Sequence, residues 1–112
     1  MKPPIYIYER RDLSVLTTVD GAERSIEATD VRNGIYQFFD AEGTELEATV
    51  YLDNRGIELC RISVAETPKA RPRTLHEILV DLLAVDEAQR NVLGTRPLEE
   101  LVRMSLQFAQ PF

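Results

Sequence analysis

Residues 35–64, IYQFFDAEGTELEATVYLDNRGIELCRISV, contain three runs rich in β-branched and aromatic side chains, which is the composition of β-strands. Two short segments separate the runs, DAEG at 40–43 and DNRG at 53–56. Each ends in a glycine that tolerates the left-handed conformation of a tight turn. This arrangement predicts a three-stranded antiparallel meander.

The second and third runs of the meander differ in their apolar pattern. The second alternates strictly, with Leu46, Ala48, Val50 and Leu52 on one side and Glu45, Glu47, Thr49 and Tyr51 on the other. That alternation predicts a half-buried strand with one face in solvent. In the third run the apolar phase changes, from Ile57 and Leu59 to Ile62 and Val64. The change predicts either a β-bulge near residues 60–61, at Cys60 and Arg61, or burial on both faces.

Upstream of the meander, residues 5–8 and 13–17 are two further strand-like runs. The charged segment ERRD at 9–12 lies between them and predicts the turn of a hairpin. Asp20 and Glu23 have the spacing of a capping box, which marks the start of a helix. We therefore expect a short helix over residues 21–28, with Ala22 and Ile26 on its inner face.

Downstream of the meander the pattern becomes helical. Residues 66–73, ETPKARPR, have two prolines and no apolar periodicity, so they read as a linker. Thr74 and Glu77 form a second capping box, followed at helical spacing by Leu75, Ile78, Leu79, Leu82 and Leu83. Asp86 is expected to cap a helix that stops at Gly94. Pro97 is expected to open a last helix, with the apolar stripe Leu98, Leu101, Val102, Leu106 and Ala109.

Strands followed by helices indicate an α+β fold. We expect a mainly antiparallel sheet of about five strands with one short helix inserted, covered by the C-terminal helices. The 112 residues are expected to form a single domain, sheet-rich over 1–65, with a linker at 66–73 and a helical part over 74–110.

Composition favours a folded, non-membrane protein. Hydrophobic residues make up 44% of the chain and charged residues 29%. Apolar runs fall far short of the roughly 20 residues needed to cross a bilayer. The start, MKPPIYIYERRD, lacks the apolar stretch of a signal peptide, and Cys60 has no partner for an internal disulfide. We therefore expect a cytoplasmic protein.

The negative charge is concentrated in the first part of the chain. Net charge is −6; residues 1–66 hold 13 acids and 7 bases, and residues 67–112 hold six of each. An acidic surface repels phosphate backbones, so we expect no nucleic-acid partner and favour a basic protein. The one basic cluster, Lys69, Arg71 and Arg73, is interpreted as a linker lying against the protein's own acidic face.

Residues suited to catalysis or metal binding are few. His76 is the only histidine, and it falls off the apolar stripe of its predicted helix. Cys60 lies mid-strand, where cysteine usually behaves as a small hydrophobe. One histidine and one cysteine do not supply a zinc site, and neither an EF-hand loop nor a phosphate-binding glycine motif occurs. We therefore expect no enzyme, no metal and no cofactor.

The most informative surface is the polar face of the middle strand. It presents Glu45, Glu47 and Tyr51, and we expect Asp40 and Glu42 at the tip of the adjoining hairpin. Tyrosine buries much area at low entropic cost, and carboxylates steer the approach of a basic partner. These five residues are the predicted partner-binding set.

The segments IYIYE (5–9), DLSVLTTVDGAERSIEATDV (12–31) and NGIYQFFDAEGTELEATV (33–50) follow one another in an order that resembles a group of small uncharacterised bacterial proteins. Some of that group resemble immunity proteins of bacterial toxin systems. The resemblance spans about residues 5–52. It implies a stoichiometric protein inhibitor whose acids complement a basic toxin. Immunity proteins share no catalytic motif, so the resemblance assigns no role to any single residue.

Two other functions remain open from the sequence. One is a structural or accessory subunit or a homo-oligomer, which would use an open sheet edge or apolar side chains such as Phe108 and Phe112. The other is a carboxylate-based small-ligand protein or enzyme, which requires a ligand-sized pocket.

Overall fold

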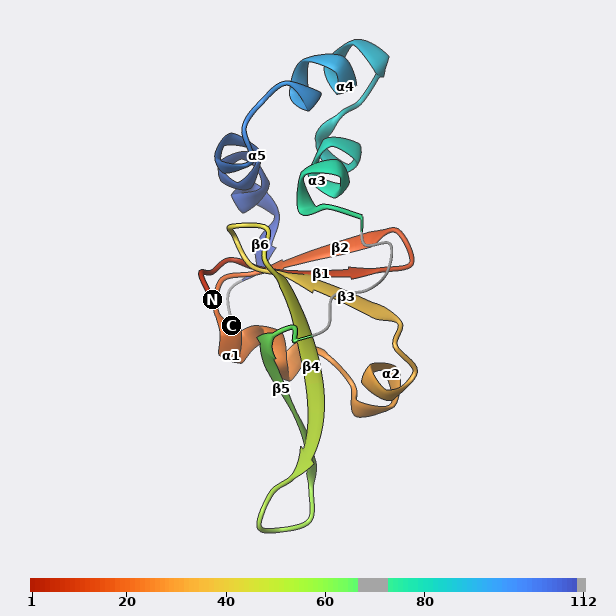
Figure 1. The fold of residues 1–112 in the computed structure, drawn as a ribbon, viewed down its shortest axis with the longest axis vertical. Coiled ribbons are helices and arrows are strands. Elements are labelled where there is room, and N and C mark those ends of the chain that lie inside the picture. Colours follow the sequence, from red (N-terminus) through yellow and green to blue (C-terminus); the bar gives the residue numbers. More distant parts are fainter. Residues whose placement is uncertain (67–72, 111–112) are drawn as a thin grey trace.

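The computed structural model describes residues 1–66 and 73–110. Its strands are β1 (Ile5–Glu9), β2 (Asp12–Leu16), β3 (Tyr36–Phe39), β4 (Glu45–Leu52), β5 (Glu58–Val64) and β6 (Ala109–Gln110). Its helices are α1 (Val19–Ser25), α2 (Ala28–Arg32), α3 (Leu75–Leu83), α4 (Glu87–Gly94), α5 (Leu98–Ser105) and the 3₁₀ helix η1 (Leu106–Phe108). Figure 1 shows α1 and α2 on one side of the sheet and α3 to α5 on the other.

The strands form one sheet in the order β5-β4-β3-β1-β2-β6, and only the β2–β6 pair is parallel. The expected hairpin is present, with Glu9 paired to Asp12 across the turn. The expected meander corresponds to β3, β4 and β5. The predicted α+β class is therefore confirmed, with one more strand (β6) and one more inserted helix (α2) than expected.

Strict alternation along the central strand β1 supplies both hydrophobic cores. Ile5 and Ile7 point to the α1 side and pack with Ala22 and Ile26, the two residues expected on the inner face of that helix. Tyr6 points to the opposite side and packs with the C-terminal helices. The other buried members of that second cluster are Val15, Phe39, Leu75, Ile78, Leu79, Val80, Leu93 and Leu101. The sheet is thus covered on both faces at its centre.

Helix α1 begins earlier than its sequence indicates. Thr18 is the N-cap, because its hydroxyl accepts a hydrogen bond from the Gly21 N–H at 2.9 Å. The expected capping box of Asp20 and Glu23 is therefore wrong. Asp20 instead lies in the first turn and pairs with Arg24, where a carboxylate also interacts favourably with the helix dipole.

The C-terminal helices begin where their capping residues indicate. The Thr74 hydroxyl accepts from the Glu77 N–H at 3.1 Å, and the Asp86 carboxylate accepts from the Gln89 N–H at 2.8 Å. Helix α4 ends at Gly94, and Pro97 occupies the N-cap position of α5. Local hydrogen bonding by short polar side chains sets the starts of α3 and α4, which is why the sequence predicts them.

The expected bulge in the third meander strand is absent. Pairing of β4 with β5 continues without interruption from Leu46 opposite Val64 to Leu52 opposite Glu58. The change of apolar phase has another cause: β5 leaves the covered part of the sheet, so Ile57 and Leu59 are exposed rather than buried.

Two further features complete the architecture. Helix α5 ends at Ser105, so the expectation of a last helix that extends through Ala109 is wrong. The chain instead returns to the sheet through η1, and Ala109 pairs with Val15 of β2. None of the helices in the described part of the chain is long and apolar enough to cross a membrane.

Candidate functional site

The hairpin formed by β4 and β5 projects past α1 and α2, at the end of the molecule opposite the C-terminal helices (Figure 1). Its inner half is anchored on the α1 side, where Leu46 and Ile62 join the first core cluster. The buried members of the second core cluster include no residue of either strand. The side of the hairpin that faces away from α1 and α2 is therefore the candidate contact surface, and we call it the open hairpin face.

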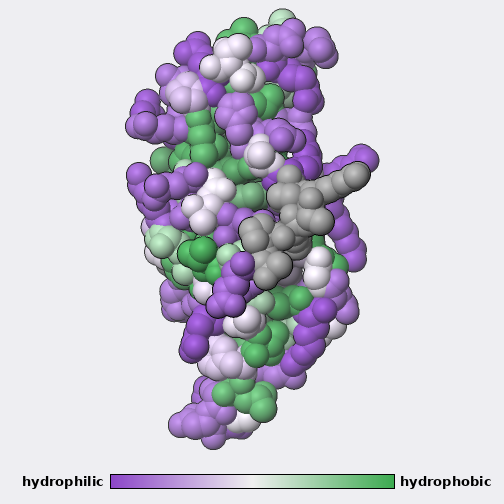
Figure 2. Space-filling model, viewed as in Figure 1, coloured by the Kyte–Doolittle hydropathy of each residue, from purple (hydrophilic) through white to green (hydrophobic). Residues whose placement is uncertain are grey.

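The open hairpin face carries both polar and apolar side chains. Because residues opposite one another in an antiparallel pair share a face, it contains Glu45, Glu47, Thr49, Tyr51, Leu59, Arg61 and Ser63. Tyr51 and Leu59 are partly exposed. At the outer end, Ile57 is 48% exposed, and Leu52, on the opposite side of β4 from Tyr51, is 66% exposed. Figure 2 shows apolar groups at the surface along this projecting end of the molecule.

Tyr51 is held in a defined position by a cation–π contact. The guanidinium carbon of Arg61 lies 4.5 Å from the centre of the Tyr51 ring. This contact orients the ring and places a positive charge on the same face as Glu45 and Glu47. The composition of the face is therefore less acidic than the sequence of β4 alone indicates.

The turn at the end of the hairpin is ordered by Asp53. Its carboxylate accepts from the backbone N–H groups of Arg55 at 2.8 Å and Ile57 at 2.9 Å. These hydrogen bonds lower the pKa of Asp53, and the bond from Ile57 has the largest effect. Gly56 adopts a φ of +78°, which closes the turn. The exposed apolar residues on either side are thus presented by a pre-formed turn.

Strand β5 is one edge of the sheet. Exposed edges offer unpaired backbone groups to other chains. One such group is satisfied internally, because the Ile62 N–H donates to the Glu23 carboxylate at 2.7 Å. Glu23 therefore covers the inner part of the β5 edge, and the outer part, toward Glu58, extends beyond this contact.

Asp40 does not lie where the sequence analysis places it. It is only 3% exposed, and its carboxylate accepts from the backbone N–H groups of Lys2, Glu42 and Thr44. The expectation that Asp40 is displayed at a hairpin tip is wrong, because the side chain closes the β3–β4 turn. Its signal was present in the sequence, since aspartate at the start of a turn commonly accepts hydrogen bonds from backbone groups just ahead of it.

The remaining members of the predicted set lie at different points. Tyr51 is on the outer part of the hairpin, Glu45 and Glu47 are half-buried near its base, and Glu42 is exposed in the β3–β4 turn. Glu45 and Glu47 also border a hollow of about 140 Å³ beside Tyr36. Small-molecule sites are usually larger, at roughly 300–1,000 Å³. The hollow is therefore smaller than an ordinary small-molecule site.

The two side chains considered for nucleophilic chemistry have structural neighbours. A ring nitrogen of His76 (Nε2) lies 2.7 Å from the Arg96 carbonyl oxygen, which links α3 to the loop before α5. Cys60 is half-buried, and burial raises the pKa of its thiol, which reduces the thiolate needed for attack. Among the described residues, no group of three or more histidine, cysteine or acidic side chains is placed to hold a metal ion.

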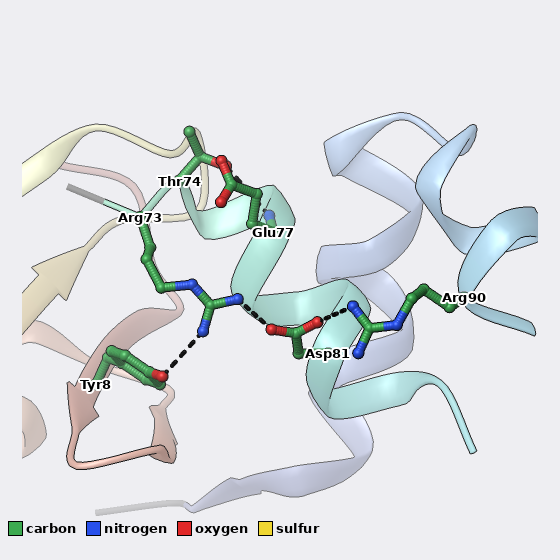
Figure 3. Close-up of polar contacts among 6 residues, drawn as sticks. All are labelled: Tyr8, Arg73, Thr74, Glu77, Asp81 and Arg90. Carbon is green, nitrogen blue, oxygen red and sulfur yellow. Dashed lines mark hydrogen bonds and ion pairs between the residues drawn. The ribbon is translucent and has the colours of Figure 1, made fainter. Parts of the chain in front are cut away.

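A polar cluster joins the C-terminal helices to the β1–β2 hairpin (Figure 3). Arg73 donates to the Tyr8 hydroxyl at 3.1 Å and forms an ion pair with Asp81. Arg90 from α4 pairs with the other carboxylate oxygen of Asp81. The hydrogen bonds from Arg73 and then Arg90 lower the pKa of Asp81, so this carboxylate stays charged at neutral pH.

No local spacing in the sequence indicates this cluster, because its members are separated by 8 to 65 positions along the chain. Of the three bases in the linker, Arg73 forms an ion pair with Asp81, and Lys69 and Arg71 lie outside the described residues.

Comparisons with protein-family models, with curated proteins and with solved structures returned no match to this chain. The resemblance to immunity proteins therefore stays a prediction from the sequence.

Proposed function

We propose that this chain is a protein-binding module whose contact surface is the open hairpin face together with its apolar tip. The observation that carries the proposal is the projection of β4 and β5 past α1 and α2, with Leu52 and Ile57 exposed on either side of a pre-formed turn. Contiguous exposed apolar groups on a soluble domain commonly mark protein-interaction sites.

The chemistry of the surface supports binding rather than catalysis. Tyr51 offers a large, amphipathic side chain already oriented by Arg61, so little conformational entropy is lost when a partner covers it. Pre-ordering of the turn by Asp53 lowers the same cost for the apolar tip. These features favour a stoichiometric contact.

The partner that best fits is a basic protein. The chain carries a net charge of −6, and all of the excess lies in residues 1–66, which include the hairpin. Such a charge attracts a basic protein over distances of about a Debye length. Steric blockade of a basic toxin, as the resemblance to immunity proteins implies, is the specific form of this proposal. Cytoplasmic location is part of the same proposal.

The experiment compares two matched double variants of the full chain. Leu52→Ser with Ile57→Ser removes the apolar tip, whereas Val85→Ser with Val92→Ser removes exposed apolar residues of the helical layer. Each is used with wild type to capture proteins from the source cells. We expect one basic protein to bind wild type and the helical variant stoichiometrically. Its affinity for the hairpin variant, measured calorimetrically with purified partner, should fall by at least about tenfold.

Equal capture by both variants would contradict the choice of surface. Failure of a purified captured protein to bind in a defined ratio would contradict the proposal of a protein-binding module.

The open β5 edge favours a second candidate, a homo-oligomer joined edge to edge. Light scattering over a concentration series separates the two, because wild type should remain monomeric if the hairpin serves another protein.

A further inference from the structure

A groove of about 450 Å³ lies between the β1–β2 hairpin and the helices α3 and α4. Its charged lining consists of Arg11, Arg73 and Arg90 against a single acid, Asp81. The lining thus has an excess of two positive charges, in a protein whose net charge is −6. The groove is on a different part of the molecule from the open hairpin face, and the proposed function leaves it unused.

Two of the arginines are pre-positioned. Asp81 bridges Arg73 and Arg90, and the Tyr8 hydroxyl accepts a further hydrogen bond from Arg73 (Figure 3). The Arg73 carbonyl oxygen also accepts from the Gln37 side chain at 3.1 Å. A guanidinium has five N–H donors, and these contacts use only some of them on either arginine. The remaining donors are available to a bound anion.

The third arginine is held at a conformational cost. Arg10 and Arg11 form the two-residue turn between β1 and β2 with φ angles of +46° and +74°. Such turns strongly prefer asparagine and glycine, because a Cβ atom disfavours positive φ. Arg11 lines the groove and makes no hydrogen bond or ion pair with the residues that the structure describes. Its guanidinium therefore has all of its donors free within this part of the chain.

The groove also has an apolar part, formed by Leu13, Ile78 and Leu82. Its volume lies within the range of small-molecule sites, roughly 300–1,000 Å³. A ligand that combines an anion with an apolar group would contact both parts. Among common anions, a phosphate monoester carries a charge of about −2 at pH 7 and presents three acceptor oxygens to arginine.

We propose that this groove binds a small phosphate monoester, with the phosphoryl group among Arg11, Arg73 and Arg90 and the ester substituent over the apolar part. The dianion balances the two excess positive charges of the lining. Arg11 supplies the donors that the protein itself leaves unused, which gives this strained turn residue a role.

Calorimetric titration of the full chain tests the proposal, with phenyl phosphate, inorganic phosphate and benzenesulfonate as probes at constant ionic strength. We expect saturable binding of phenyl phosphate, weaker binding of inorganic phosphate, and the weakest binding of the monoanionic sulfonate. Equal or tighter binding of inorganic phosphate would overturn the assignment of an ester, and absence of saturable phenyl phosphate binding would overturn the site.

Two neighbouring substitutions provide the matched comparison. Arg11→Gly and Arg10→Gly each remove one positive charge and one positive-φ side chain from the same turn, but only Arg11 lines the groove. Both variants should melt at a higher temperature than wild type, which shows that they fold. Phenyl phosphate binding should weaken about tenfold in Arg11→Gly and change little in Arg10→Gly. Equal weakening in the two variants would show a nonspecific charge effect and overturn the proposal.

Discussion

The hydroxyl groups of Tyr6 and Ser105 lie 2.7 Å apart in the interior and join β1 to α5. Both side chains are fully buried. The Ser105 hydroxyl also lies 2.7 Å from the Val102 carbonyl oxygen, which can only accept. Since serine has one hydroxyl proton, Ser105 donates to Val102 and Tyr6 donates to Ser105.

This direction of donation predicts unequal costs for two conservative substitutions. Ser105→Ala leaves the Tyr6 hydroxyl buried without its acceptor and should lower the free energy of unfolding by roughly 1–3 kcal/mol. Tyr6→Phe leaves Ser105 still bonded to Val102 and should cost about 1 kcal/mol or less. Urea denaturation measures both. A larger cost for Tyr6→Phe than for Ser105→Ala would contradict the inferred direction.

The ion pairs of Asp81 predict a loss of stability in acid. Hydrogen bonds from Arg73 and Arg90 hold the pKa of Asp81 below its ordinary value of 3.8. A carboxylate with a lowered folded-state pKa contributes stability that is complete above its unfolded pKa and is lost as pH falls toward its folded pKa. Asp81→Asn should therefore reduce stability at pH 7, and the difference from wild type should shrink below about pH 3.8. Thermal unfolding across this pH range checks both parts, and a difference that stays constant with pH would contradict the assignment.

Glu23 predicts a link between stability and self-association. Glu23→Ala removes the acceptor of the Ile62 N–H at the sheet edge and should destabilise the fold by about 1.5–3 kcal/mol. It should also promote edge-to-edge association at higher protein concentration, because a covered part of β5 becomes open. Glu27→Ala is the matched control, since Glu27 is exposed and its side chain caps no helix. Urea denaturation and light scattering should show no change in that control; equal effects in the two variants would reject the edge role.

Two turn glycines predict a graded response to alanine. Gly43 and Gly56 have φ angles of +81° and +78°, so alanine is strained at both, by roughly 1–2 kcal/mol. An added Cβ at Gly43 would lie 3.1 Å from the Leu98 side chain, whereas Gly56 has open space around it. Gly43→Ala should therefore lower the melting temperature more than Gly56→Ala. The opposite order in thermal unfolding would show that the β3–β4 turn does not press on α5 as the structure has it.

Parts of the fold governed by local interactions were predictable from the sequence. Thr74, Asp86 and Pro97 mark the starts of helices through contacts with the next few residues, and the meander strands follow from turn residues between β-rich runs. The two residues of β6 show no strand pattern in the sequence, because their pairing with β2 depends on the return of the chain to the sheet after α5.

Tertiary placement explains the errors. Thr18, rather than Asp20, caps α1: the strand leading into the helix ends at Leu16, one residue earlier than the sequence pattern indicates. The apolar pattern of the third meander run predicts a bulge if all of its apolar residues are buried. In the projecting hairpin Ile57 and Leu59 are exposed, so the strand pairs without a bulge. The arginine groove depends on side chains from four separate segments, so no local spacing predicts it.

The return of β6 to the sheet constrains how the helical layer can move. At its start the layer is fastened through Arg73 to Tyr8 and Gln37, and at its end Ala109 is hydrogen-bonded into the sheet beside Val15. A segment fixed at both ends cannot swing outward as a rigid arm about a single hinge. Detachment requires that one of the two attachments breaks. We therefore expect the amide hydrogens of α3 and α5 to exchange as slowly as those of the central strands.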